Sequence, residues 1–256
     1  ITMTTNEIYA VILSLLAAVS AGIIGSFALM KKMTLAGDVI SHIALPGLGL
    51  AFLFKINPII GGAATLILGT IIIWNLEKET GLATETTIGV IFAASVAIGA
   101  LITPKEDLID ALFGGFQPIS YFGFLVGLGI VALIVIFLFK FKNKLMISLF
   151  SPELAAATGI NIDRINLYYL LSFSLTVILG LQFLGALLVG ALIIVPAAIG
   201  RQLARNFETF LIASSVASVL SVTLGIFASV YLSISLGPTI ICIAAILFAL
   251  SLIRKR

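Results

Sequence analysis

The sequence predicts an all-α integral membrane protein, a bundle of about nine transmembrane helices. Of its 256 residues, 61% are hydrophobic and only 10% are charged, whereas about a quarter of the residues of a soluble domain are charged. The mean hydropathy is +1.28, and apolar runs of about 20 residues, the length that spans a bilayer, fill the sequence. Since no polar stretch is long enough for a second domain, we expect residues 1–256 to form a single transmembrane domain.

The predicted spans are apolar runs bounded by charged residues, Pro or Asn. They cover residues 8–30, 35–54, 57–75, 86–102, 119–139, 165–182, 184–200, 208–231 and 236–253. The sixth and seventh runs are the weakest pair, because only Gln182 to Gly185 separates them. A bundle of eight spans, in which one of this pair is short or broken, is therefore the alternative to nine.

Basic residues predict the orientation of the bundle, because cytoplasmic loops retain Lys and Arg. With nine spans and the N-terminus outside, twelve basic residues fall on the inner side, whereas Lys55 and Lys105 fall on the outer side. The inner residues are Lys31, Lys32, Lys78, Lys140, Lys142, Lys144, Arg164, Arg201, Arg205, Arg254, Lys255 and Arg256. Eight spans would split these clusters, so the charges favour nine. The net charge of +3 then reflects topology, and we expect no nucleic-acid partner.

Several kinds of chemistry are excluded by residue types that the sequence lacks. The single cysteine, Cys242, lies in an apolar run and cannot form a disulfide or a cysteine metal cluster within one chain. No Gly-rich phosphate-binding loop follows a strand, so any ATP that powers transport is bound by another chain. The single histidine has no facing serine or second histidine, so the sequence predicts no protease dyad, no catalytic zinc and no enzyme.

One apolar run carries the residues on which a transport function depends. Asp38 is the only charged residue well inside a span, and His42 is the only histidine of the chain. A spacing of four residues brings both side chains to one face of a helix, about 6 Å apart at their β-carbons. Imidazole nitrogen and carboxylate oxygen suit zinc, manganese or ferrous iron, but not copper(I), which prefers sulfur. We expect these residues to contact a metal in passage; a proton relay and a purely structural pair are the alternatives.

Pro46 and Gly47 follow this pair by about one helical turn. Proline removes a backbone hydrogen bond of the helix, and unwound segments of transporters often line the transport path. The two residues therefore predict an interruption of the second span, which either lines the path or is a packing kink.

The inner connection between residues 140 and 164 is predicted to contain a short helix at about 151–160. Ser151, Pro152 and Glu153 form a helix-start signal, with Ser as N-cap, Pro at the first position and an acid in the first turn. Gly159 is a plausible C-terminal cap. We expect this helix to lie across the cytoplasmic face of the bundle; an ordinary capped loop helix without a partner is the alternative.

Three motifs occur in the order that is typical of one transporter family. The first is small-Gly-Asp-x-x-Ser-His-x-x-x-Pro-Gly, at Ala36–Gly47, and the second is aromatic-x-Pro-Glu-x-Ala-x-x-x-Gly-Ile, at Phe150–Ile160. The third joins Leu184–Val189, LGALLV, to Pro196–Ala198, PAA. With these motifs the chain resembles, over nearly its whole length, the metal-type ABC permeases that carry zinc, manganese or iron.

The resemblance implies a type II ABC importer bundle in the bacterial plasma membrane. Such a permease works as a homodimer in the lipid, on two ATPase subunits, and receives metal from an extracellular metal-binding protein. No covalently bound cofactor is implied, because the divalent metal is the substrate. By the resemblance, Asp38 and His42 are the metal-path residues. The residues that couple the permease to its ATPase would be Ser151, Pro152, Glu153, Ala156 and Gly159.

The sequence departs from the family pattern on the outer side. The family often has an aspartate shortly after the Leu112–Gly114 segment, where this chain has Tyr121, Phe122 and Gly123. By the resemblance, Leu45–Gly47, which follows His42, is more similar to the manganese and iron members.

A second function class remains open from the residues alone. Asp38 and His42 could serve a secondary transporter or channel for protons or cations, driven by an ion gradient. Such a protein needs no coupling helix, so the capped segment at 151–160 favours the ATP-driven importer.

Overall fold

The computed structural model describes residues 4–33, 35–103 and 119–253, with only the backbone described at residues 182, 183, 186 and 187. Lys105, the Leu112–Gly114 segment and the basic tail Arg254–Arg256 lie outside the described residues. Within these ranges the chain forms helices joined by short connections, without a strand. The helices are α1 Thr5–Met30, α2 Ala36–His42, α3 Leu45–Phe54, α4 Pro58–Thr80, α5 Thr84–Ile102, α7 Tyr121–Phe150, α8 Pro152–Ala157, α9 Ile162–Leu184, α10 Ala186–Leu203, α11 Phe207–Leu232 and α12 Leu236–Ile253.

The predicted membrane helices are confirmed. Among the described residues, eight helical segments are long and apolar enough to cross a membrane, with α2 and α3 counted together as Ala36–Phe54. Leu188–Leu203 of α10 is a shorter apolar helix, so the predicted eight or nine spans agree with the structure. The weak pair of spans is divided at Gly185, whose φ of +74° breaks the helix between α9 and α10.

Several helices begin at a polar side chain that accepts a hydrogen bond from a free backbone amide of the first turn. At the start of α1, the Thr4 amide donates to Glu7 at 2.7 Å, and the Glu7 amide donates to the Thr4 hydroxyl at 3.4 Å. Asn57 caps α4 by accepting from the Ile59 amide at 2.9 Å. These local pairs fix where the spans begin.

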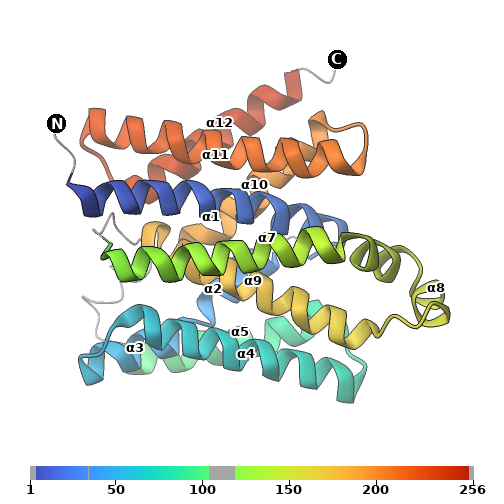
Figure 1. The fold of residues 1–256 in the computed structure, drawn as a ribbon. Helices are drawn as coiled ribbons and strands as arrows, with labels where there is room; N and C mark the ends of the chain where they lie inside the picture. The colour runs from blue at the N-terminus through green and yellow to red at the C-terminus, as the bar shows by residue number, and fades with distance from the viewer. Residues whose placement is uncertain (1–3, 34, 104–118, 254–256) are drawn as a thin grey trace.

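The helices lie side by side in an elongated bundle (Figure 1). α1, α7 and α9 run through the middle, α3, α4 and α5 lie on one side, and α11 and α12 lie on the other. α1 begins and α12 ends at opposite ends of the bundle, as an odd number of crossings requires. The rings of Phe27, Tyr169 and Phe173 are buried and pack edge to face between α1 and α9.

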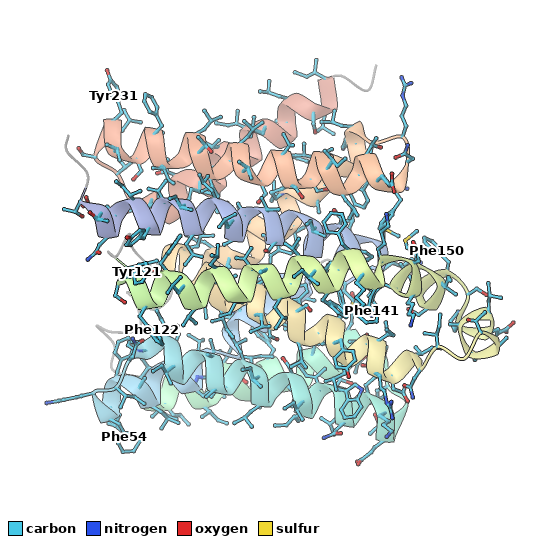
Figure 2. The ribbon with its side chains drawn as sticks, in the orientation of Figure 1. Phe54, Tyr121, Phe122, Phe141, Phe150 and Tyr231 are labelled. Atoms are coloured by element: carbon cyan, nitrogen blue, oxygen red, sulfur yellow. The ribbon has the colours of Figure 1, made fainter. Side chains whose placement is uncertain are left out.

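Exposed aromatic side chains mark one end of the bundle (Figure 2). Phe54, Tyr121, Phe122 and Tyr231 all lie there, and each is at least 62% exposed. Aromatic residues gather at membrane–water boundaries, where a ring can remain partly apolar and partly hydrated. This end carries Lys55 and is the predicted outer side.

α7 is longer than the predicted span 119–139. It has 30 residues, about 45 Å of helix, whereas the hydrocarbon core is only about 30 Å thick. The helix continues through Lys140, Lys142 and Lys144 to Phe150, because basic residues end an apolar run without ending a helix. Its extension carries α8 away from the rest of the bundle (Figure 1).

Candidate functional site

The predicted interruption of the second span is confirmed by the break between α2 and α3. α2 ends at His42 and α3 begins at Leu45, with Pro46 in its first turn. The Ile43 and Ala44 amides donate to the Ile40 and Ser41 carbonyls at 3.0 and 3.2 Å, three residues back. These tighter turns replace the helical bond that the proline nitrogen cannot make.

Asp38 and His42 lie on one face of α2, as the spacing predicts. His42 Nδ1 is 3.9 Å from Asp38 Oδ1 and 2.7 Å from the Asp38 backbone carbonyl. A carbonyl oxygen can only accept, so Nδ1 carries the proton in this bond. The lone pair of neutral His42 therefore lies on Nε2, the nitrogen that can bind a metal.

The two side chains differ in exposure. The Asp38 side chain is 52% exposed, whereas that of His42 is 13% exposed. The ring of Phe92, on α5, stands edge-on to the His42 ring with 5.5 Å between centroids and an interplanar angle of 84°. The histidine is therefore held in the bundle by an aromatic neighbour, while the carboxylate stands at the surface of the chain.

Two glycines bring α10 directly against the backbone of this site. A β-carbon at Gly190 would lie 2.4 Å from the Asp38 nitrogen and 2.5 Å from its α-carbon. A β-carbon at Gly37 would lie 3.1 Å from the Gly190 carbonyl oxygen. Only glycine permits this approach, so Gly190 fixes the position of Asp38. Sequence reasoning missed Gly190 and Phe92, because both contact the site from other helices.

The described residues place no third side chain of the usual metal-binding types beside this pair. Within the described ranges, no group of three or more His, Cys, Asp or Glu side chains is close enough to hold an ion. The pair itself offers one imidazole nitrogen and one carboxylate.

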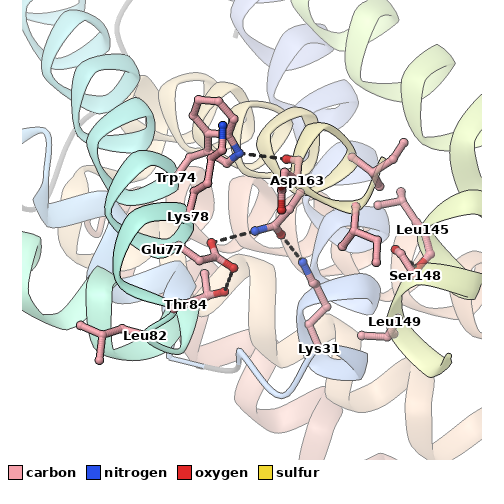
Figure 3. Close-up of a pocket in the computed structure, with 14 residues that line it drawn as sticks. Lys31, Trp74, Glu77, Lys78, Leu82, Thr84, Leu145, Ser148, Leu149 and Asp163 are labelled. Atoms are coloured by element: carbon pink, nitrogen blue, oxygen red, sulfur yellow. Dashed lines mark hydrogen bonds between the residues drawn. The ribbon is translucent and has the colours of Figure 1, made fainter. Parts of the chain in front are cut away.

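A second polar cluster, missed by the sequence analysis, joins four helices near the predicted cytoplasmic end (Figure 3). Lys31, at the end of α1, donates to Asn166 Oδ1 of α9. The Asn166 amide donates to Glu77 of α4 at 2.8 Å, and Glu77 also accepts from Thr84 of α5 at 2.7 Å. We call these four residues the Lys31 network. It lines a cavity of about 440 Å³.

The charge state of Lys31 is set by its burial. Burial lowers the pKa of Lys31 to about 8, because desolvation of the ammonium outweighs the attraction of the Glu77 carboxylate. Lys31 Nζ also lies 4.7 Å from the centre of the Tyr169 ring. The charged groups of the Lys31 network therefore make their contacts with other residues of the same chain.

The short helix predicted at about 151–160 is confirmed as α8. Its first turn is capped by Ser151, whose hydroxyl accepts from the Leu154 amide at 3.4 Å. Gly159 has a φ of +73° and donates to the Ala156 carbonyl, while Ile160 donates to the Ala155 carbonyl. These two bonds form a Schellman motif, which ends the helix.

α8 presents apolar surface to its surroundings. Ala155 is its buried residue, whereas Leu154 is 52% exposed and Phe150, just before the helix, is 68% exposed. Pro152, Glu153 and Ala156 are exposed as well. Such a surface on a rigid projecting helix fits a protein partner.

A family model matches almost the whole chain. Residues 3–255 match the model of the ABC 3 transport family. The chain is 33% identical over 239 residues to the high-affinity zinc uptake system membrane protein ZnuB of Haemophilus influenzae, covering 91% of each chain. It is 32% identical to the manganese transport system membrane protein MntC of Halalkalibacterium halodurans, covering 93% of this chain and 83% of that one.

A solved structure shares the fold. PsaBC from Streptococcus pneumoniae, solved in complex with a Fab, matches with a TM-score of 0.82 and 26% identity. The match covers 97% of this chain and 91% of that chain.

Proposed function

This chain belongs to the ABC 3 transport family, and from that premise we propose that it is the membrane permease subunit of an ATP-driven importer of manganese or zinc. The observation that carries the proposal is the Asp38–His42 pair on one face of α2, with Nε2 directed away from the backbone bond. The relatives named for zinc and manganese transport support these substrates. No comparison supports the alternative of a gradient-driven transporter or channel.

A second copy of the chain would supply the missing ligands. Exposed small residues follow one another along α5 beside α2: Gly89, Ala93, Ala97 and Ala100. A β-carbon at Gly89 would meet nothing within 4 Å, so the packing of one chain gives no reason for glycine there. Small residues allow close helix contact in membranes, and this supports a homodimer through α2 and α5.

A two-fold axis along this face would bring two Asp38–His42 pairs together. Two imidazole nitrogens and two carboxylates suit tetrahedral zinc or, with waters, six-coordinate manganese. Because a metal in transit must be released, the site should bind transiently. Ligation would use the neutral imidazole, with its lone pair on Nε2.

Partner chains would supply the energy and the substrate. We place the ATPase subunits against α8, because α8 is rigid at both ends and exposes Leu154 and Ala156. An extracellular metal-binding protein would deliver the ion at the opposite end. Replacing Ala156 with Asp would bury an unpaired charge in this contact, and should uncouple ATP hydrolysis from uptake without affecting metal ligation.

Uptake of radioactive manganese and of zinc into proteoliposomes that contain the permease and its ATPase tests the proposal. We expect uptake to require ATP and to persist after a protonophore collapses the proton gradient. Uptake without ATP that stops with the protonophore would establish the gradient-driven alternative instead.

A further inference from the structure

A second cavity, of about 360 Å³, lies at the cytoplasmic end between α1, α7, α10 and α11. Its floor is apolar and includes Met146 of α7 together with Phe207 and Phe210 of α11. It does not include Asp38 or His42, and its lining differs from that of the cavity beside the Lys31 network.

Three cations surround this floor. Lys32 follows α1, Arg201 lies in the last turn of α10, and Arg205 lies between α10 and α11; all three side chains are exposed. None of the described residues that line the cavity is acidic. The acid nearest in sequence, Glu208, is bound by Lys142 at 2.9 Å. The cavity therefore combines a net positive rim with an apolar floor.

The place of the cavity in the bundle indicates what can enter it. Its walls come from the last residues of α1 and the first residues of α11, where apolar spans give way to charged residues. This is the level of the phospholipid headgroups on the inner side. α8 lies farther out along the chain's projecting end (Figure 1).

We propose that this cavity binds one anionic phospholipid of the inner leaflet, with its phosphate on Lys32, Arg201 and Arg205 and the start of an acyl chain on the apolar floor. Guanidinium groups match phosphate oxygens in bidentate geometry. The flexible Met146 side chain adapts to a lipid chain. Basic pockets at the cytoplasmic ends of membrane helices suit anionic headgroups. A bound lipid would join the projecting end of α7 to α10 and α11.

Lipid binding to the purified full-length permease in nanodiscs provides the test, read out by native mass spectrometry. Phosphatidylglycerol and phosphatidylcholine of matched chain length are the probes. We expect a preference for phosphatidylglycerol on the order of 100-fold from three contacting cations. The triple substitution Lys32→Gln, Arg201→Gln, Arg205→Gln should abolish it.

A matched variant distinguishes a site from general surface charge. Lys140→Gln, Lys144→Gln and Arg164→Gln together remove the same charge from the cytoplasmic side outside the cavity, and should leave the preference intact. If the triple variant of the cavity does not fold, Arg205→Gln alone should lower the preference roughly fivefold.

Three results would overturn the proposal. The first is an unchanged preference in the cavity variant. The second is displacement of phosphatidylglycerol by inorganic phosphate at equal concentration, which would make the cavity a site for free phosphate. The third is loss of the lipid when the ATPase subunit binds, which would make that protein the occupant.

Discussion

The Asp38–His42 pair and the Lys31 network are both polar clusters in an apolar bundle, yet their contacts differ in kind. In the network, Asn166 and Glu77 make hydrogen bonds that join helices within the chain. In the pair, the Asp38 side chain is half exposed, and the described residues offer no third ligand. Polar groups are costly in a membrane unless they are satisfied. The satisfied cluster therefore stabilises the fold, and we propose that the exposed pair binds a metal together with a second chain.

The largest expected effect comes from removing the ligands of the pair. His42→Ala and Asp38→Asn should each lower metal uptake at least about 100-fold, because one of the few metal ligands is lost. Expression, dimerisation and ATPase association should change little, since Asp38 is half exposed and the His42 ring makes only one aromatic contact with another helix. Asp163→Asn, an exposed carboxylate at the start of α9, is the matched control and should transport normally. Wild-type uptake by His42→Ala would make the pair structural.

A smaller effect is expected at the helix that positions the pair. Gly190→Ala should lower uptake about tenfold and destabilise the fold by about 1–3 kcal/mol, because its β-carbon meets the Asp38 backbone. Gly129→Ala, on α7, adds a β-carbon where nothing lies within 4 Å. Uptake and thermal unfolding of both variants check the prediction. Equal uptake and equal thermal unfolding of Gly190→Ala and Gly129→Ala would show that α10 does not fix the position of Asp38.

Substitution in the Lys31 network should lower the stability of the fold and leave metal binding unchanged, the opposite of the effect expected for the Asp38–His42 pair. Asn166→Ala leaves Lys31 and Glu77 without their shared partner, at a cost of about 1–3 kcal/mol in the free energy of unfolding. The unfolding temperature should fall by several degrees, while the folded fraction keeps its affinity for metal. Asn143→Ala, on the exposed surface of α7, should change neither the unfolding temperature nor the affinity for metal. A specific loss of metal affinity in Asn166→Ala would assign the network to the transport site.

The last prediction concerns pH and leaves transport unchanged. The pKa of Lys31 is lowered to about 8 in the fold from 10.5, so the unfolded chain binds more protons between these values. Stability should therefore rise as the pH increases from about 8 towards 10.5. This rise in stability should be absent in Lys31→Met. The unfolding temperatures of both proteins, measured between about pH 8 and 10.5, check the prediction. A decrease of stability attributable to Lys31 over the same range would show that its charged form is favoured by the fold.

Features that depend on local chemistry were predictable from the sequence. Pro46 predicts the break after α2, because a proline inside an apolar span removes a helical bond. Ser151 and Gly159 predict the two ends of α8, because capping involves residues three to five positions away. The same-face placement of Asp38 and His42 follows from helical periodicity.

Features that depend on distant contacts were not predictable. Lys31 and Asn166 are 135 positions apart, and Asn166 and Glu77 are 89 apart; nothing in either segment specifies the other. Lys31 therefore looked only like a topology signal. Gly190 is one of 23 glycines, and its role becomes visible only where α10 crosses α2.

The central claim, that metal passes between two Asp38–His42 pairs, is tested most directly by X-ray absorption at the zinc edge. The permease should be held with ATP by a hydrolysis-deficient ATPase, so that an ion in transit is retained. The account predicts one zinc per two permease chains, with two imidazole nitrogens at about 2.0 Å, and no such zinc in His42→Ala. One zinc per chain, or a zinc without imidazole ligands, would contradict it.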